Sequence, residues 1–315
     1  MKRIPFPAAT TAVLATVILL AACGSDAPAA DDTPLVTAAV TTQASAPPAA
    51  STTSTSPPVS RIVSLSPTAT EMLYAIGAGA QVLAVDDQSN YPPEVLDKPH
   101  ELSGYQPNVE AIAALKPDLV LIGDDTSGLS KQLDSLGLAT WVGLATTSFD
   151  GMYDQIEQLG ALTGHVGDAA ELVSKVQTDI HGAVKAAPKP AQPLTYYHEL
   201  DNTYYSVTEN TFIGQVYSLF GMHSIADLQE VSSDYPQLSA ESIISANPDF
   251  IFLADGGFGE SPETVAARPG WANLEAVTNG NVVVVDADIS SRWGPRIVDY
   301  IKAISAAVSK AVAAG

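Results

Sequence analysis

From residue 61 onward, the apolar residues of the chain alternate between short continuous runs and stretches with helical spacing. IVSLS (62–66) and VLAVD (82–86) are continuous runs, and a helical segment from Thr70 to Ile76 lies between them. Continuous apolar runs of this length indicate strands that are buried on both faces. Strands that alternate with helices predict a mostly parallel sheet in this part of the chain.

One pattern of apolar and polar residues occurs twice. The two copies are EAIAALKPDLVLI at 110–122 and ESIISANPDFIFL at 241–253. Each reads as a helix that ends at a proline, then an aspartate, then a buried strand, because proline cannot extend a helix. The repetition predicts two lobes of similar build, each with its own sheet.

A long helix is predicted between the two lobes. Within 168–187, one face carries the apolar residues Leu172, Val173, Val176, Ile180 and Val184. This spacing is typical of an amphipathic helix, and Pro188 and Pro190 end it. The predicted fold is therefore α/β, with two Rossmann-like lobes of mostly parallel sheets (61–164 and 190–315) joined by a single long helix (165–189).

The N-terminal residues have the form of an export signal. Lys2 and Arg3 precede an uncharged stretch and then Leu20-Ala21-Ala22-Cys23, which resembles the bacterial lipobox. We expect residues 1–22 to be a lipoprotein signal peptide. A lipid on Cys23 would anchor the exported protein to the outer face of the cytoplasmic membrane.

Composition narrows the remaining possibilities. Residues 23–60 are dominated by Ala, Ser, Thr and Pro, which predicts a flexible tether. Cys23 is the only cysteine, so a lipidated protein would have no disulfide. The net charge of −21 repels nucleic acid phosphates, which argues against a nucleic-acid binder.

Catalytic motifs are missing from the sequence. There is no nucleophile elbow and no phosphate-binding loop, and the His198-Glu199 pair lacks the second histidine of a zinc motif. We expect no enzyme; the only material for an exported α/β hydrolase is Ser64, Ser66 and His198. Two acidic pairs, 86–87 and 124–125, follow predicted strands and are expected to be solvated surface carboxylates, with an action on a ligand or metal as the alternative.

Four segments together resemble a known family. They are RIVSLSPTATEMLYAIGAGAQVLAV, NYPPEV, LSGYQPNVEAIAALKPDLVLI and SRWGPRIVDY. The chain from Arg61 onward is similar to extracytoplasmic solute-binding proteins of ABC importers for ferric siderophores, haem and vitamin B12. The resemblance implies a monomeric receptor without a cofactor that captures a metal chelate, either a ferric siderophore or a corrinoid, and delivers it to a permease with its ATPase.

The resemblance also implies roles for particular residues. Glu110 and Glu241 match the two glutamates that dock to permease arginines, although a glutamate in the first turn of a helix also stabilises that helix. The positions that match the ligand pocket are Tyr91, Tyr105, His198, Tyr235 and Arg292. Arg296 is expected to hold the C-terminal segment to a lobe.

Departures from the family pattern leave the ligand open. Gly123 replaces an aromatic residue and Ser291 replaces an acid of the B12-binding pattern. Tyr105 matches an iron-ligating tyrosine of haem carriers, but their neighbouring arginine is absent. Haem therefore stays an alternative ligand. A divalent-metal receptor is a further alternative, although the sequence lacks a His-rich loop.

Overall fold

The computed structural model describes residues 57–230 and 232–314. The predicted signal peptide, Cys23 and the tether up to residue 56 lie outside the described residues. The described residues belong to one compact unit. In the described part of the chain, no helix is both long and apolar enough to cross a membrane.

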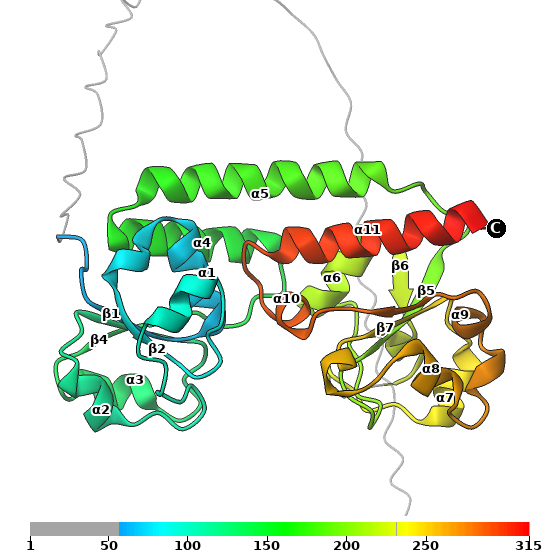
Figure 1. The fold of residues 1–315 in the computed structure, drawn as a ribbon, viewed down its shortest axis with the longest axis horizontal. Helices are drawn as coiled ribbons and strands as arrows, with labels where there is room; N and C mark the ends of the chain where they lie inside the picture. The colour runs from blue at the N-terminus through cyan, green and yellow to red at the C-terminus, as the bar shows by residue number, and fades with distance from the viewer. Residues whose placement is uncertain (1–56, 231, 315) are drawn as a thin grey trace, which may run out of the picture. The chain divides into compact units, whose positions relative to one another are not determined.

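The first lobe is built on a parallel four-stranded sheet of order β2-β1-β3-β4 (Figure 1). Its strands are β1 Ile62–Leu65, β2 Val82–Val85, β3 Leu119–Ile122 and β4 Ala139–Val142. Its helices are α1 Pro67–Ala75, α2 Val109–Ala114, α3 Leu129–Asp134 and α4 Phe149–Thr163. Because β1 and β3 are buried along their whole length, their runs of apolar residues carry no alternation.

The second lobe repeats this arrangement with the order β6-β5-β7-β8. Its strands are β5 Leu194–Glu199, β6 Met222–Ser224, β7 Phe250–Leu253 and β8 Val282–Val284. Its helices are α6 Phe212–Ser218, α7 Ala240–Ala246, α8 Pro262–Ala266, α9 Glu275–Thr278 and α10 Ala287–Ser291. Five short 3₁₀ helices complete the two lobes: η1 Ala78–Gln81, η2 Pro93–Asp97, η3 Ile225–Leu228, η4 Gly256–Phe258 and η5 Trp271–Asn273.

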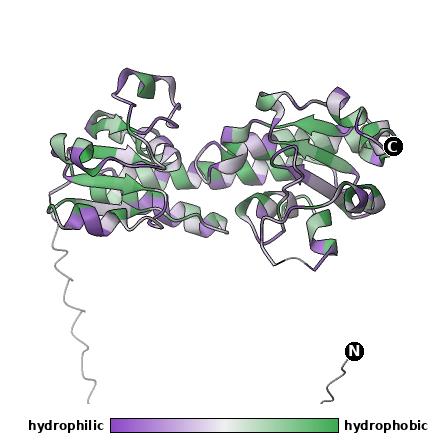
Figure 2. Ribbon diagram, turned by 90° about the horizontal axis from the view of Figure 1, so that it is seen from below, coloured by the Kyte–Doolittle hydropathy of each residue, from purple (hydrophilic) through white to green (hydrophobic). Residues whose placement is uncertain are grey.

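A single helix, α5 Val166–Ala186, connects the two lobes along the chain. It packs against α4 and against the final helix α11 Ile297–Ala314, and it buries Val173, Val176 and Ile180 (Figure 1). One apolar core runs from the first sheet through these helices to the second sheet. The strands of the first sheet are largely hydrophobic in Figure 2. The predicted α/β class with two parallel sheets is confirmed.

The repeated proline-aspartate turn has the same structural role in both lobes. Asp118 Oδ2 accepts hydrogen bonds from the backbone N–H of Ser60 and of Arg61, both at 3.0 Å. Asp249 Oδ2 accepts one from the backbone N–H of Thr195 at 2.7 Å. Each aspartate therefore holds the chain at the start of the first strand of its lobe. This part of the repeat belongs to the architecture.

Candidate ligand-binding pocket

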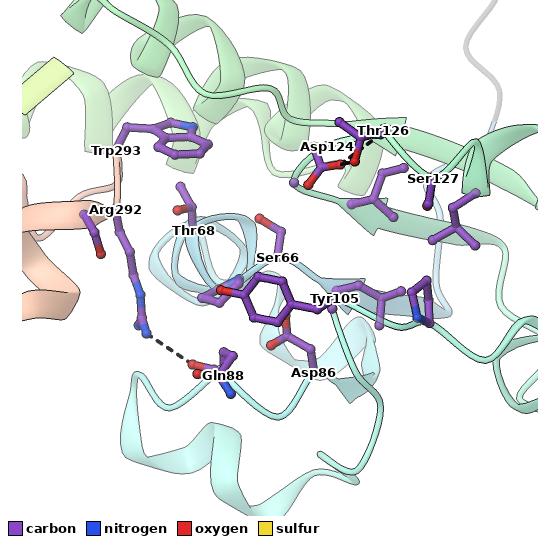
Figure 3. A pocket seen from close by; sticks show the side chains of 18 of the residues that line it. Ser66, Thr68, Asp86, Gln88, Tyr105, Asp124, Thr126, Ser127, Arg292 and Trp293 are labelled. Carbon is purple, nitrogen blue, oxygen red and sulfur yellow. Dashed lines mark hydrogen bonds between the residues drawn. The ribbon is translucent and has the colours of Figure 1, made fainter. Parts of the chain in front are cut away.

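The main candidate site lies at the carboxyl ends of the strands of the first sheet. It is a pocket of about 490 Å³, and the residues that follow β1, β2 and β3 form its floor, namely Ser66, Asp86 and Gly123 (Figure 3). Parallel sheets place their ligand sites at this edge. The small residues Ser66 and Gly123 leave the edge open.

A segment from the C-terminal part of the chain closes one side of the pocket. Asp288 and Ser291 on α10 line it, together with Arg292 and Trp293, which follow α10. The indole of Trp293 is held in place by a hydrogen bond from its Nε1 to Gln155 Oε1 at 3.0 Å. Trp293 was not among the residues predicted from the sequence. The SRWGPR motif that contains it was the available signal.

Tyr105 lines the pocket from the loop that leads into α2. Its side chain is 85% exposed, so the ring is free to cover a ligand. Figure 3 shows the ring beside Asp86, on the open side of the pocket. Aromatic rings bury much area at little cost in conformational entropy, which suits a large chelate.

Arg292 also lines the pocket, but the protein already satisfies most of its guanidinium. Nη1 donates to Glu71 Oε1 at 2.8 Å and to Asn90 Oδ1 at 2.9 Å. Nη2 donates to Asp288 Oδ1 at 2.8 Å and to the Gln88 carbonyl at 3.1 Å. Arg292 is therefore not free to pair with a ligand oxygen, because two carboxylates already balance its charge.

Glu71 on α1 joins this arginine to a second one. Arg296 donates from Nε to Glu71 Oε2 at 2.8 Å and from Nη2 to Oε1 at 2.5 Å. Glu71 itself is buried, so the two arginines provide its charge balance. Arg296 thus ties the start of α11 to the first lobe, as the sequence predicted.

Tyr91 lies against Arg296 and outside the main pocket. The guanidinium carbon of Arg296 sits 4.2 Å from the centre of the Tyr91 ring. Tyr91 lines a separate hollow with Glu71 and Lys302. The structure therefore does not bring Tyr91 together with Tyr105.

His198 lies in the core of the second lobe, which corrects its assignment to the pocket. Its side chain on β5 is fully buried, and its Nδ1 lies 2.8 Å from the Tyr217 hydroxyl. Burial lowers the pKa of His198 to about 3, so the ring is neutral. β5 is buried on both faces over its last four residues, so the sequence could not show that this histidine points into the core.

The remaining predicted residues lie on the surface. Tyr235 in the second lobe is about half exposed and does not line the main pocket. Glu110 and Glu241 are exposed on the first turns of α2 and α7. Neither glutamate forms an ion pair with any residue that the structure describes.

Asp86 differs most from its sequence-based expectation. The carboxylate expected to be solvated is only 1% exposed, whereas its neighbour Asp87 is exposed. Asp86 Oδ1 has no hydrogen-bond partner among the described residues. Burial raises the pKa of Asp86. Its position directly after a buried strand was the signal in the sequence.

The same edge of the second sheet is filled by a charged cluster. Glu199 at the end of β5 is fully buried, and its two oxygens accept hydrogen bonds from Arg268 Nη1 and Nη2, both at 2.6 Å. Arg268 Nη2 also donates to Glu260 Oε2 at 2.7 Å. Asp255, which lies just after β7, is 4% exposed. Burial, and to a lesser extent the nearby charge of Glu199, raises the pKa of Asp255 to about 7.

Across residues 57–230 and 232–314, no group of three or more His, Cys, Asp or Glu side chains is arranged to hold a metal ion. At the two sheet edges, Asp86 is buried and Glu199 is paired with Arg268.

Known proteins similar to this chain are binding proteins. Residues 62–289 match the family described as periplasmic binding protein. A cobalamin-binding protein of Halobacterium salinarum is 33% identical over 248 residues, which are 76% of this chain but only 66% of that relative. An uncharacterized ABC transporter substrate-binding lipoprotein of Bacillus subtilis is 30% identical over 256 residues, 79% of each chain.

A solved structure shares the fold. The periplasmic vitamin B12-binding protein of Vibrio cholerae superposes with a TM-score of 0.68 at 28% identity, covering 81% of this chain and 98% of that one. With two parallel four-stranded sheets, an open pocket at one sheet edge and a family match over most of its length, the chain belongs to the periplasmic binding protein family.

Proposed function

We propose that this protein is the lipid-anchored, extracytoplasmic substrate-binding component of an ABC importer, and that it captures a metal chelate. The chelate is a corrinoid or a ferric siderophore. Relatives with binding and transport names support this assignment. The anchor would be a lipid on Cys23, and a monomer is expected.

The observation that carries the proposal is the open pocket with its aromatic rim. Tyr105 and Trp293 approach the pocket from two distant parts of the chain. A volume of about 490 Å³ is within the range of small-molecule sites. Part of a large chelate would rest in the pocket while these rings cover its exposed face.

Docking to the permease is proposed for Glu110 and Glu241. Both carboxylates are exposed at equivalent points of the two lobes, seven residues before Pro117 and Pro248. An exposed carboxylate without an internal partner is available to an arginine of another protein. Their contribution to the helix macrodipole is separable from docking, because it acts on stability and not on uptake.

The hydrolase alternative loses its geometric basis. The Ser64 hydroxyl donates to the Ser66 carbonyl in the first lobe, whereas His198 contacts Tyr217 in the second. A serine nucleophile needs its base within hydrogen-bond reach. The candidate residues therefore do not form a catalytic group, and the named relatives are binding proteins.

Trp293 offers a direct test of the pocket. The chain has three tryptophans, and Trp293 alone among them lines the pocket, while Trp271 is buried in the second lobe. We expect cyanocobalamin or a ferric hydroxamate siderophore to quench the fluorescence of Trp293 saturably. In the Trp293→Phe variant most of the quenching should disappear while calorimetry still detects binding. A panel of these chelates, haemin and Zn²⁺ that gives no saturable binding to the wild type would overturn the proposal.

A further inference from the structure

We propose that Asp86 determines the class of chelate that this pocket accepts. It selects a neutral or cationic chelate that offers N–H hydrogen-bond donors, and it disfavours a chelate that carries carboxylates. The inference rests on the proposed binding function and adds the chemical character of the ligand to it.

Asp86 lies at the edge of the pocket with its carboxylate buried. It follows β2 directly and belongs to the lining of the pocket, below Tyr105 (Figure 3). Gly104 lies opposite, and a Cβ at this position would come within 2.9 Å of Asp86 Oδ2. The absence of a side chain at residue 104 therefore leaves room for the carboxylate at the edge of the pocket.

The protein fills only part of the hydrogen-bonding capacity of this carboxylate. Hydrogen bonds from Ser89 and Gln88 partly offset the effect of burial on its pKa, and the Ser89 hydroxyl also hydrogen-bonds to a neighbouring hydroxyl. Ser89 Oγ donates to Thr70 Oγ1 at 3.0 Å, and Thr70 Oγ1 donates to Ser64 Oγ at 2.9 Å. Asp86 Oδ1 has no partner among the described residues. Buried acceptors are nearly always satisfied in folded proteins, so a donor from a bound ligand is the natural partner.

The charges around the pocket also favour a neutral or cationic ligand. Asp86, Asp124 and Asp288 line it, and Arg292 is the only basic side chain among its described lining residues. Ion pairs with Glu71 and Asp288 already balance Arg292. Hydrogen bonds from Thr126 hold the pKa of Asp124 below its usual range, so this acid is ionised. A ligand carboxylate would therefore meet acids without a free cation.

The test uses two chelates with one macrocycle and opposite peripheral chemistry. Dicyanocobinamide carries carboxamide N–H donors, whereas dicyanocobyrinic acid carries carboxylates at the corresponding positions. We expect the wild type to bind the carboxamide form more tightly by about tenfold or more. The carboxylate form offers no N–H donor, so it would leave the buried Asp86 acceptor unpaired. Calorimetric titration at neutral pH measures both affinities.

Three variants separate the role of Asp86 from general charge. Asp86→Ala should weaken dicyanocobinamide by about tenfold, since it removes the acceptor. Asp86→Asn keeps a carbonyl acceptor and should retain most of that affinity while it discriminates less against the carboxylate form. Asp87→Asn is the matched control: it removes one negative charge from the adjacent, exposed residue and should change neither affinity. Thermal unfolding of each variant reports whether it folds.

The outcomes distinguish this inference from the proposed function. If the wild type binds either corrinoid but all three variants behave like the wild type, binding stands and the role of Asp86 is refuted. Equal wild-type affinity for the two corrinoids would also refute it. If the wild type binds neither corrinoid, the same variants are compared with cationic ferrioxamine B and with haemin, a dipropionate. Tighter binding of haemin would then overturn the inference, and binding of no chelate would overturn the proposed function and the inference with it.

Discussion

The two lobes have the same strand order but different side chains at the edge where ligands bind. In the first lobe, the residues after β1 and β3 are small, and the buried Asp86 after β2 lacks a partner for Oδ1. In the second lobe, Glu199 at the equivalent edge is held by Arg268, and Glu260 joins the pair. The comparison shows that topology gives each lobe a potential site. The side chains that follow the strands decide whether it is open or filled.

Replacement of the arginine in the charged cluster of each lobe should reveal the largest difference in stability between the two clusters. Arg268→Ala leaves Glu199 fully buried without a counter-charge, and we expect the free energy of unfolding to fall by about 3–5 kcal/mol. Arg292→Ala should cost less, about 1.5–3 kcal/mol, because Glu71 keeps its two hydrogen bonds with Arg296. Urea unfolding monitored by circular dichroism measures both values. Equal losses would show that the two clusters are energetically equivalent.

The two lobes are alike in one feature, an exposed glutamate in the first turn of α2 and of α7 that is proposed to dock to the permease. Replacement of both Glu110 and Glu241 by Ala should reduce uptake through the permease by about tenfold or more, because each removes a charge-assisted contact. Affinity for the chelate should stay unchanged. Glu263→Ala is a matched control, since Glu263 is also an exposed glutamate in the first turn of a helix. Intact uptake in the double variant would refute the docking assignment.

The effect expected from Asp255 depends on pH. Burial and Glu199 raise the pKa of Asp255 to about 7, above the ordinary value of 3.8. The folded state therefore binds a proton that the unfolded state releases, and stability falls as the pH rises from 3.8 to about 7. The difference in unfolding free energy between Asp255→Asn and the wild type should grow in favour of the variant over this window and stay constant above it. A difference that does not vary with pH would exclude the raised pKa.

Much of the fold could be predicted from the sequence because its signals are local. Proline cannot extend a helix, so Pro117 and Pro248 mark the helix ends. The spacing of the apolar residues alone indicates the buried face of the linking helix. The observed α5 begins at Val166 and ends at Ala186, close to the predicted 168–187.

The site was less predictable because it depends on contacts between distant residues. Two adjacent aspartates, Asp86 and Asp87, look alike in the sequence, yet one is buried and the other exposed. His198 lies on a strand that is buried on both faces at this point, so no alternation indicated its direction. Arg292 is engaged by Glu71, which is far away in the chain.

The most direct test of the central claim asks which lobe edge holds the ligand. Calorimetric titration with cyanocobalamin should compare the wild type with Tyr105→Ala, Tyr235→Ala and Phe258→Ala. Phe258 is an aromatic control in the second lobe with 87% exposure, close to the 85% of Tyr105. We predict 1:1 binding that Tyr105→Ala weakens by about tenfold and that neither Tyr235→Ala nor Phe258→Ala changes, because neither residue lines the pocket. Binding that survives Tyr105→Ala unchanged but is weakened by Phe258→Ala would contradict this prediction.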